Sequence, residues 1–490
     1  MRKCAALLLA GWVSACSLAP EYERPDAAIS PVYRDGEVDA ASQADAPLAI
    51  ELGWRQFFRD PRLQSLIAAA LTNNRDLAQS YARVDQARAQ FRIQAAGRLP
   101  ALDATGTGTR SQTPIAGLGA VGSAIPGDGS GGGGPPVPDS IRFTQFGANL
   151  GVSSFELDLW GRVRNLTRQQ RENWLASVEG ARAYRLSLIA QVAATYFDIR
   201  AGEERIALAR RSLEGRREGE RIAHMRLEAG VTSTADYDQT VLLLTQAETE
   251  LAEIQRTTEQ ARNLLNVLVG GPITGPMPAG LSLSEQVVPI TAGLPSSLLE
   301  QRPDILQAEH ALMGANANIG AARAAYFPTI SLTGTLGFMS NALGSLFDGA
   351  SESWSYGGTA SLPIFNWGRR EAEVRLSKAQ AAELEAAYQS AVQNAFREVA
   401  DGLVGRERFA EQIEIQQRTI AAQRRLARTA RLRYDNGIAI YLEVLDAERS
   451  LFSASQTLIS LRATELQNAV NLYTALGGGL EEVAAASGED

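Results

Sequence analysis

The chain has 490 residues, of which 45% are hydrophobic but only 7% aromatic, and its formal net charge is −8. Ala, Gln, Glu and Arg dominate long stretches, which indicates extended helices rather than the thick cores of several globular domains. The negative charge excludes the broad basic surface with which many proteins bind nucleic acid.

The first residues have the organisation of a bacterial lipoprotein signal. Two basic residues precede an apolar stretch from Ala5 to Gly11, as in a secretory signal peptide. The sequence VSAC that ends at Cys16 resembles a lipobox, so we predict a signal peptide over residues 1–15 and lipidation of Cys16. By resemblance to lipoprotein sorting rules, Ser17 points to the outer membrane. An ordinary signal peptide with an incidental cysteine is the alternative.

A first repeat follows an N-terminal segment. Residues 16–62 are predicted to be lipid-anchored and extended, because much of this stretch is rich in Pro, Ala and Asp. The repeat covers residues 63–270. Apolar residues at helical spacing predict a helix over Leu63–Arg98, and alternation of polar and apolar residues predicts strands over Ala101–Thr109 and Phe143–Leu157.

Residues 111–139 between these strands form a Gly-rich stretch whose composition cannot bury a core. We interpret it as a surface loop between two strands, because strand-like sequence lies on both sides of it. An interdomain linker is the alternative, and the composition gives no indication of a role.

A long helical hairpin completes the first repeat. The stretch from Gly161 to Ala229 is helical in pattern, and at about 1.5 Å per residue it would extend ~100 Å. Gly230 is predicted to be the turn, and a return helix runs from about Ser233 to Val269. A helix of this length exceeds what a globular domain needs.

The second half of the chain repeats this order of elements. Trp367-Gly368-Arg369 matches Trp160-Gly161-Arg162 at a distance of 207 residues, at the same joint between a strand and a long helix. We predict a connection over residues 271–294 and a second repeat over residues 295–476. A tail that we predict to be disordered covers residues 477–490.

The elements of the second repeat follow the same patterns. A helix is predicted over residues 295–325, and strands are predicted from Thr329 to Phe338 and from Trp354 to Leu362. A second helical hairpin then runs to about Leu476, with Gly437 as its turn.

Four strands do not close a barrel. An open sheet edge cannot lie in lipid, and bacterial outer-membrane barrels have about eight strands or more. Since no apolar run after the N-terminus is long enough for a membrane-spanning helix, we predict that several copies pool their strands into one barrel. Trp354, Tyr356 and Phe338 could form an aromatic girdle at the membrane surface, and ordinary sheet aromatics are the alternative.

The last helix carries an apolar seam of heptad spacing, which predicts helix-on-helix packing. The seam consists of Val444, Ala447, Leu451, Ala454, Leu458 and Leu461. The same seam recurs 207 residues earlier, from Tyr237 to Ile254. The two hairpins are therefore expected to pack in the same way.

Leu442, Asp446 and Arg449 lie on the face of the last helix that is turned away from this seam. They lie within a few turns of Gly437, at the end of the hairpin farthest from the strands. In a tube of helices such a face can point into the lumen, where a ring of Asp446 side chains would narrow the passage electrostatically. The alternative is a solvated coiled-coil face, the commoner role of an Asp/Arg pair at this spacing.

Nothing in the sequence indicates an enzyme. A phosphate-binding Gly-x-x-x-x-Gly-Lys-Ser/Thr motif is absent, so the chain holds no energy source of its own. His224 and His310 lie in helical stretches without the spacing of metal ligands. We therefore predict no catalytic residue, no metal site and no cofactor.

Together, these features resemble the TolC-like outer-membrane efflux family, in its lipoprotein branch of NodT-type, RND-associated outer-membrane factors. The resemblance covers nearly the whole chain. It is carried by the lipobox, the duplicated Trp-Gly-Arg joints, and two specific stretches, LEQRPDI over Leu299–Ile305 and YLEVLDAERSL over Tyr441–Leu451.

The resemblance implies a mixed fold built from an internal duplication. It would be a trimeric outer-membrane β-barrel, with four strands per subunit, continued by a long periplasmic α-helical barrel. Leu442, Asp446 and Arg449 would close the periplasmic aperture of this barrel. The implied partners are two further copies of the chain, a periplasmic adaptor protein, an inner-membrane pump of RND type and outer-membrane lipid, but no nucleic acid.

We predict that the protein is the outer-membrane channel of a tripartite efflux system. It would passively export small molecules that an inner-membrane pump delivers through the adaptor, and it would be lipid-anchored in the outer membrane and extend into the periplasm. One alternative is a structural coiled-coil lipoprotein of the envelope, for which the alternating strands would have no use. Another is the exit duct of a protein secretion system. The sequence does not identify the exported solutes.

Overall fold

The computed structural model describes residues 18–26, 47–114, 140–275, 277, 280–291 and 302–479. The chain divides into two compact units. Unit 1 is drawn from residues 1–23, 88–172 and 313–382, and unit 2 from residues 24–87, 173–312 and 383–490. Each unit therefore combines segments of both predicted repeats.

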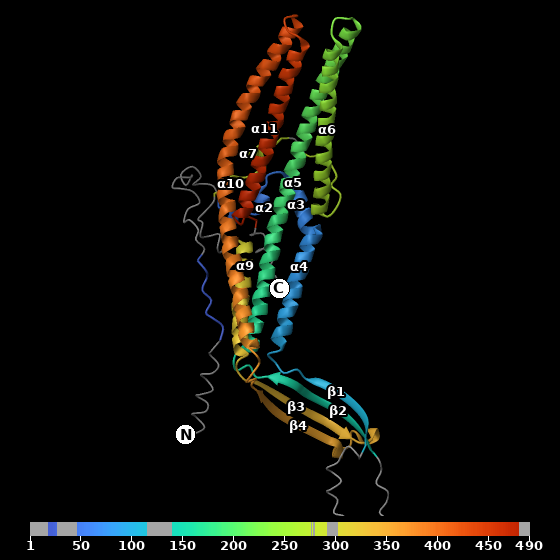
Figure 1. Cartoon of the computed structure of the whole chain (residues 1–490), viewed down its shortest axis with the longest axis vertical. Helices are drawn as coiled ribbons and strands as arrows, with labels where there is room; N and C mark the ends of the chain where they lie inside the picture. The colour runs from blue at the N-terminus through green and yellow to red at the C-terminus, as the bar shows by residue number, and fades with distance from the viewer. Residues whose placement is uncertain are drawn as a thin grey trace, which may run out of the picture. The chain divides into compact units, whose positions relative to one another are not determined.

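Unit 1 contains a four-stranded antiparallel sheet with the order β1-β2-β3-β4 (Figure 1). The strands are β1 (Asp103–Pro114), β2 (Ser140–Glu156), β3 (Thr329–Ser340) and β4 (Glu352–Ser361). Cross-strand partners share a face, and the register places Leu150, Leu336 and Trp354 together. On the other face the hydroxyl oxygens of Thr335 and Ser355 lie 2.7 Å apart. The sheet thus has one apolar and one hydroxyl-rich face, as the alternation predicts.

β1 is longer than the sequence predicts. Regular pairing with β2 continues to Pro114, opposite Ser140. The Gln112 side chain donates to Ser140 Oγ (2.9 Å) and accepts from Arg142 Nε (2.8 Å). The predicted start of the Gly-rich loop at residue 111 is therefore wrong, because polar cross-strand hydrogen bonds extend the strand. The rest of this loop, residues 115–139, lies outside the described residues.

The helix predicted over Leu63–Arg98 is two helices, α3 (Pro61–Asn73) and α4 (Arg75–Ala96). The intervening Asn74 is buried and has extended backbone angles, φ −62° and ψ 128°. Its Oδ1 accepts the N–H group three residues later, and its Nδ2 donates to the carbonyl of Leu268, 3.0 Å away. The single-helix prediction is wrong because this side chain caps a new helix.

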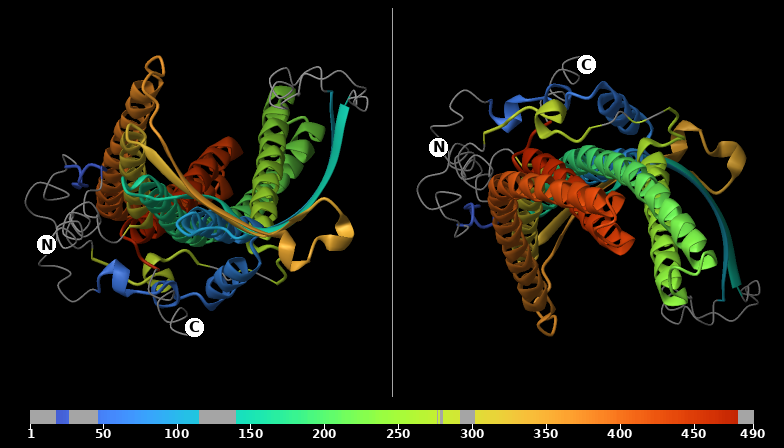
Figure 2. Two further views of the ribbon diagram at one scale, coloured as in Figure 1. Left: turned by 90° about the horizontal axis from the view of Figure 1, so that it is seen from below. Right: turned by 90° about the horizontal axis from the view of Figure 1, so that it is seen from above.

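Four long helices form two hairpins, as predicted. They are α5 (Arg162–Glu228, 67 residues) with α6 (Thr234–Val269, 36 residues), and α10 (Arg369–Asp435, 67 residues) with α11 (Tyr441–Ala475, 35 residues). In unit 2 the hairpins lie side by side (Figure 1, Figure 2), and Arg205 of α5 donates to Gln456 of α11 (2.8 Å). The predicted seam residues of α6 and α11 are buried or half-buried.

The segment predicted to be extended over residues 16–62 contributes to the core of unit 2. Two short helices, η1 (Ala49–Glu51) and α2 (Trp54–Phe57), interrupt it. The α2 aromatic side chains are buried, and the ring of Phe57 stacks on Tyr473 of α11 at 3.9 Å between centroids. The extended prediction does not hold for this part, because aromatic side chains of this size bury large apolar surfaces.

The remaining elements are short, apart from α9. They are α7 (Leu283–Gln286), α9 (Pro303–Ala324), η5 (Leu343–Ser345) and η6 (Gly349–Ser351). Gly477–Gly479, which the sequence assigns to the disordered tail, are buried, and the Gly479 N–H donates to the Leu52 carbonyl (3.3 Å). Among the helices of the described ranges, none combines the length and the apolar character needed to cross a membrane.

Candidate functional site

Both hairpins turn on a glycine with a left-handed backbone. Gly230, between α5 and α6, has φ 69°, and Gly437, between α10 and α11, has φ 71°. In each turn the next residue, Val231 or Ile438, donates its N–H to a carbonyl five residues back, at 2.9 and 2.8 Å. Glycine adopts this conformation without steric cost. The two predicted turn residues therefore lie at the turns, in what we call the first tip (residues 226–238) and the second tip (residues 433–445).

A polar cap closes the first tip. Ser233 Oγ accepts the N–H of Asp236 (3.1 Å), and the Asp236 carboxylate accepts the N–H and Oγ–H of Ser233 (3.3 and 2.8 Å). These hydrogen bonds from Ser233 lower the pKa of Asp236 below its usual value. This reciprocal arrangement satisfies donors at the start of α6 that the helix itself leaves free.

Apolar packing holds the second tip. Ile440 precedes α11 and makes no side-chain capping hydrogen bond. Instead, Tyr441 is buried, and its ring meets Tyr434 of α10 edge-on at 4.9 Å between centroids. Tyr441, Val444 and Leu445 form a core cluster with residues of α6 and α10, against which a residue of α5 also packs. The core beneath α11 thus joins the two hairpins.

The three predicted gate residues lie on the opposite, exposed face of α11. Leu442 is 39% exposed, and Asp446 and Arg449 are exposed as well. Arg449 Nη2 lies 3.2 Å from Asp446 Oδ1, one helical turn away. An exposed ion pair of this kind contributes only ~0.2–1 kcal/mol to stability. The stripe of three residues is therefore not needed to hold α11 in place.

A buried arginine of α5 lies within electrostatic reach of this stripe. Arg216 is 9% exposed, and its Nη1 has no hydrogen-bond partner. Burial lowers its pKa, against the opposing effect of Glu250 on α6; among the nearby charges of α11, Arg449 lowers it further and Glu448 and Asp446 raise it. Asp446 therefore experiences positive charge from the first hairpin as well as from Arg449.

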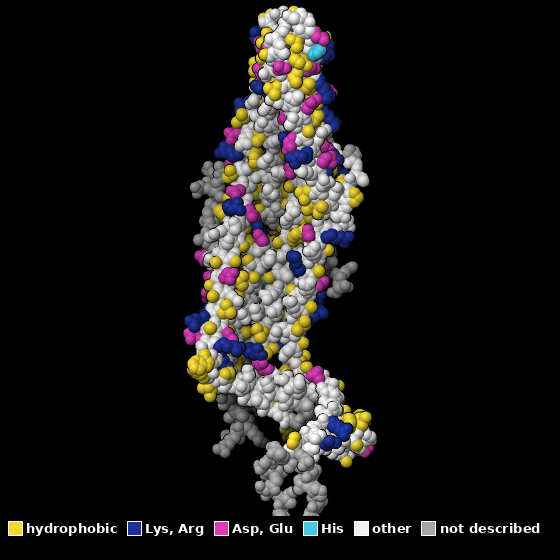
Figure 3. Space-filling view, turned by 45° about the vertical axis from the view of Figure 1, so that its right-hand side comes forward, with side chains coloured by type: hydrophobic (Ala, Val, Ile, Leu, Met, Phe, Trp, Pro, Cys, Tyr) yellow, Lys and Arg dark blue, Asp and Glu magenta, His cyan; other side chains and the backbone are white. Residues whose placement is uncertain are grey.

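Charges of both signs are mixed along the hairpin helices. On the face shown in Figure 3, basic and acidic side chains are interspersed along the long helices. Many of them form exposed pairs three or four residues apart, such as Arg256 with Glu253 and Arg397 with Asp401. This is the pattern of solvated helix surfaces.

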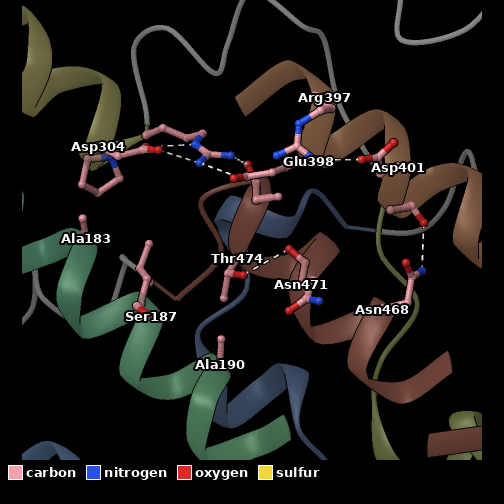
Figure 4. Close-up of a pocket in the computed structure, with 15 residues that line it drawn as sticks. Ala183, Ser187, Ala190, Asp304, Arg397, Glu398, Asp401, Asn468, Asn471 and Thr474 are labelled. Carbon is pink, nitrogen blue, oxygen red and sulfur yellow. Dashed lines mark hydrogen bonds and ion pairs between the residues drawn. The ribbon is translucent and has the colours of Figure 1, made fainter. Parts of the chain in front are cut away.

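A second polar site surrounds Arg302 in unit 2. A pocket of about 540 Å³ is lined by residues of α5, α10 and α11 and by the start of α9 (Figure 4). The buried Arg302 donates to the carboxylates of Asp304 and Glu398, at 2.6 and 2.9 Å. It also donates to the carbonyl of Ala475, at 3.0 Å. The charge of Arg302 is therefore compensated by two carboxylates within the protein and is not left free for an anionic ligand.

Cys16, the predicted lipidation site, lies outside the described residues. Two residues further on, the carbonyl of Leu18 accepts a hydrogen bond from Arg323 Nη1 of α9 (3.1 Å), within unit 1. A Cβ atom on Gly320 of α9 would lie 2.7 Å from the Cβ of Ala19. Sequence analysis missed this docking of the N-terminal segment, although a glycine in the middle of a helix was an available signal.

Among the described residues, no group of three or more His, Cys, Asp or Glu side chains is arranged to hold a metal ion. His224 lies near the end of α5, with its ring 5.6 Å from that of Tyr237 and its Nδ1 3.8 Å from Glu228. His310 lies within α9. Neither histidine therefore belongs to a metal-binding group of this kind among the described residues.

Comparisons with known proteins agree in pointing to one family. The sequence model of a family described as outer membrane efflux protein matches residues 66–271 and 294–478. The chain is 41% identical to the probable efflux pump outer membrane protein TtgC of Pseudomonas putida, over 95% of this chain and 93% of that protein. It is 37% identical to the cation efflux system protein CusC of Escherichia coli strain K12, over 97% and 98% of the two chains.

Solved structures show the same likeness. The open-state MtrE outer membrane channel of Neisseria gonorrhoeae matches with a TM-score of 0.80 and 37% identity, over 95% of this chain and 99% of that one. A crystal structure of CusC matches with a TM-score of 0.78 and 36% identity, over 95% and 100% of the two chains. The similarity in fold therefore extends over nearly the whole length of both proteins.

Proposed function

The chain belongs to the outer membrane efflux protein family, and on this premise we propose that it is the passive exit duct of a tripartite pump. It is an outer-membrane efflux channel, and the members of its family are channels rather than enzymes. One observation best supports a channel that can open and close. It is the exposed stripe of Leu442, Asp446 and Arg449 on α11, near the hairpin turn.

The predicted fold class is confirmed by the likeness to solved outer-membrane channels. It is that of a trimeric β-barrel with four strands per subunit and a long α-helical barrel. The chain supplies four strands and two long hairpins. We propose that two further copies complete both barrels, because β1 and β4 are the edge strands of the sheet in the described part of one chain, and lipid does not tolerate open edges.

The protein belongs to the outer membrane, as its family does. We further propose that Cys16 is lipidated and that the hairpins extend into the periplasm. The VSAC stretch and the docking of residues 18–20 on α9 support an anchored N-terminus. Labelled palmitate should be incorporated into the wild-type chain and not into Cys16→Ser, and labelling of both chains would refute lipidation at this residue.

The proposed partners are a periplasmic adaptor protein and an inner-membrane pump of RND type. The cargo is a small molecule whose class is left open by the relatives. At similar identity, their names refer to toluene, antibiotics and cations. Similarity to these relatives therefore does not indicate which solute this protein exports. The susceptibility of a deletion strain to a panel of toxic compounds would identify the cargo.

We propose that Leu442, Asp446 and Arg449 narrow the periplasmic aperture of the trimer. One Asp446 from each subunit would create a constriction whose negative charge is held next to Arg449. Asp446→Ala should therefore raise single-channel conductance of the purified protein in planar bilayers. Glu253→Ala is a matched control, because it removes an exposed Glu–Arg pair at the same three-residue spacing on α6. Equal conductance of Asp446→Ala and wild type would count against the gate.

Two alternatives predict different observations. A structural coiled-coil lipoprotein would form no pore, and it has no use for a sheet with one apolar and one hydroxyl-rich face. A protein-secretion duct would conduct, but its deletion would abolish the export of a polypeptide and leave sensitivity to small toxic compounds unchanged. Pore formation and compound susceptibility together distinguish all three functions.

A further inference from the structure

Two arginines lie side by side on one face of the sheet, at the end opposite to the one where β2 leads into α5. Arg110 of β1 pairs with Thr144 of β2, and Arg142 lies two residues before Thr144 on the same strand. Residues two apart on a strand share a face, so the two arginines are diagonal neighbours, with Cβ atoms about 7–8 Å apart. We call Arg110 and Arg142 the arginine pair.

The positive charge of the arginine pair is open to the surroundings. Both side chains are exposed, and within the described ranges neither forms an ion pair. Arg142 Nε donates to the neutral Gln112 side chain (2.8 Å). Guanidinium groups bind phosphate oxygens through paired N–H donors. Two of them at this spacing can therefore hold one phosphate group between them.

The face that carries the arginine pair is apolar further along the strands. Phe146, Ala148 and Leu150 lie at alternate positions of β2 after the pair, and Leu150 is opposite Leu336 of β3. On the surface shown in Figure 3, basic and hydrophobic side chains lie close together at this end of unit 1. In a membrane barrel the apolar face is directed toward lipid. The arginine pair thus lies at the lipid-facing rim of the sheet.

A pocket of about 530 Å³ opens on this apolar face, and we call it the Phe347 pocket. Phe347 comes from the loop between β3 and β4, is 72% exposed, and meets the ring of Phe338 edge-on at 5.5 Å between centroids. Glu352 lines the pocket from the start of β4, two strands away from Arg142. The other lining residues are mostly apolar and include Ala104, Ala148, Leu150 and Leu336. Such a lining suits a hydrocarbon chain.

The distance between the arginine pair and the Phe347 pocket matches the depth of one leaflet. Four residues of strand separate Thr144, opposite Arg110, from Ala148 in the pocket. At about 3.4 Å per residue, this separation is ~14 Å. The hydrocarbon core of a bilayer is about 30 Å thick, so one leaflet contributes ~15 Å. A lipid whose phosphate lies on the arginine pair therefore has acyl chains that reach the pocket.

We propose that the arginine pair and the Phe347 pocket bind one phosphate-bearing lipid of the outer leaflet. Arg110 and Arg142 bind the phosphate oxygens, and the pocket takes part of an acyl chain. This inference rests on the proposed function, because this end of the sheet faces the outer leaflet only if the hairpins extend into the periplasm. The bound lipid would then occupy a fixed place beside the pore.

The test is lipid retention by the purified full-length protein, measured by native mass spectrometry. The probes are lipid A with its two phosphates and dephosphorylated lipid A at the same concentration. The wild type should retain the phosphorylated form about tenfold better. The double variant Arg110→Gln/Arg142→Gln should lose this preference, and Arg110→Lys/Arg142→Lys should keep part of it. Arg98→Gln is the matched control, because it removes an exposed arginine just before β1, at the other end of the sheet.

Phe347→Ala tests the pocket separately from the charge. It truncates an exposed ring, so it should weaken retention of phosphorylated lipid A several-fold and leave weak binding of glucosamine 1-phosphate, which has no acyl chain, unchanged. Equal retention of the two forms of lipid A by the wild type, or an equal loss in Arg98→Gln, would overturn the lipid site. Competition by inorganic phosphate as strong as that by lipid A would also overturn it, in favour of a site for free phosphate.

Failure of the lipid site can be distinguished from failure of the channel. Conductance of the wild type in planar bilayers of phosphatidylcholine does not depend on a phosphorylated glycolipid. A pore without selective retention of lipid A would refute the lipid site alone, whereas the absence of any pore would refute the proposed channel.

Discussion

The two tips are duplicates that share a backbone and differ in how they are held. Both turn on a glycine near φ 70°, and both end the first helix with the same hydrogen bond across the turn. The first tip is exposed and closed by Ser233 and Asp236, whereas the second buries Tyr441 in a core shared by both hairpins. The comparison shows that the two described tips share their turn geometry and differ in side chains, and that residues of the second tip pack against the other hairpin.

The largest expected difference between the tips comes from truncating their first helical residues. Tyr441→Ala removes a buried ring and should destabilise the second tip by about 3 kcal/mol or more. The duplicate change, Thr234→Ala, removes an exposed side chain and should alter stability by less than ~0.5 kcal/mol. Hydrogen exchange of peptides from each tip, measured by mass spectrometry, would reveal the difference. Similar losses of protection in the two variants would contradict the comparison.

The turn glycines should instead behave alike. Gly230→Ala and Gly437→Ala each force a residue with a side chain into a left-handed backbone, which costs roughly 1–2 kcal/mol. Neither added methyl group would meet another atom within 4 Å, so backbone strain alone should lower the stability of each variant. Thermal unfolding of both variants should show matching decreases. A markedly larger loss for Gly437→Ala would mean that the two turns are not equivalent in backbone geometry.

Loss of the polar cap should affect the first tip alone. Ser233→Ala removes the two hydrogen bonds between the Ser233 hydroxyl and Asp236, keeps the one that the residue 233 N–H donates to the Asp236 carboxylate, and should cost ~1 kcal/mol. Ser450→Ala in α11 is a control, because that hydroxyl only donates to the Asp446 carbonyl inside the helix. Amide exchange at the start of α6 should quicken in Ser233→Ala and not in Ser450→Ala. No change at α6 would show that the cap is dispensable.

The smallest effect is a difference in pH response. Hydrogen bonds from Ser233 lower the pKa of Asp236, so the first tip is stabilised above the ordinary carboxyl pKa of ~3.9 and loses this contribution as the pH falls through the lower value. Burial raises the pKa of Tyr441. The neutral Tyr441 side chain therefore contributes to the stability of the second tip below about pH 10, and this contribution is lost as the pH rises through the higher pKa of the folded state. Hydrogen exchange followed at acid and alkaline pH should therefore loosen different tips first.

Local patterns predict much of this fold. Alternation located the four strands, and long helical stretches punctuated by Gly230 and Gly437 located the hairpins, because each signal lies within a few neighbouring residues. The gate stripe followed from the heptad seam, since a helix fixes which residues share a face. The exposed positions of Leu442, Asp446 and Arg449 agree with that reasoning, and their role as a gate remains our proposal.

The features that sequence analysis missed depend on contacts between distant segments. Asn74 divides a helix because its side chain reaches the carbonyl of Leu268. Phe57 is buried in the core because the ring of Tyr473, hundreds of residues later in the sequence, stacks on it. In the sequence Gly219 is only a poor helix former, and the structure shows that Tyr441 packs closely against it. No periodicity encodes such pairs, because the partner is chosen by tertiary packing.

The docking of the N-terminal segment on α9 has a consequence for the fatty acids proposed on Cys16. Leu18 is held by Arg323, and two residues of chain reach at most ~7 Å. If Cys16 is lipidated as we propose, its acyl groups would be attached within this distance of Leu18 and would enter the bilayer beside the final turn of α9. The proposed anchor would then hold the membrane at a defined position on the protein, and residues inserted between Cys16 and Leu18 would loosen that attachment.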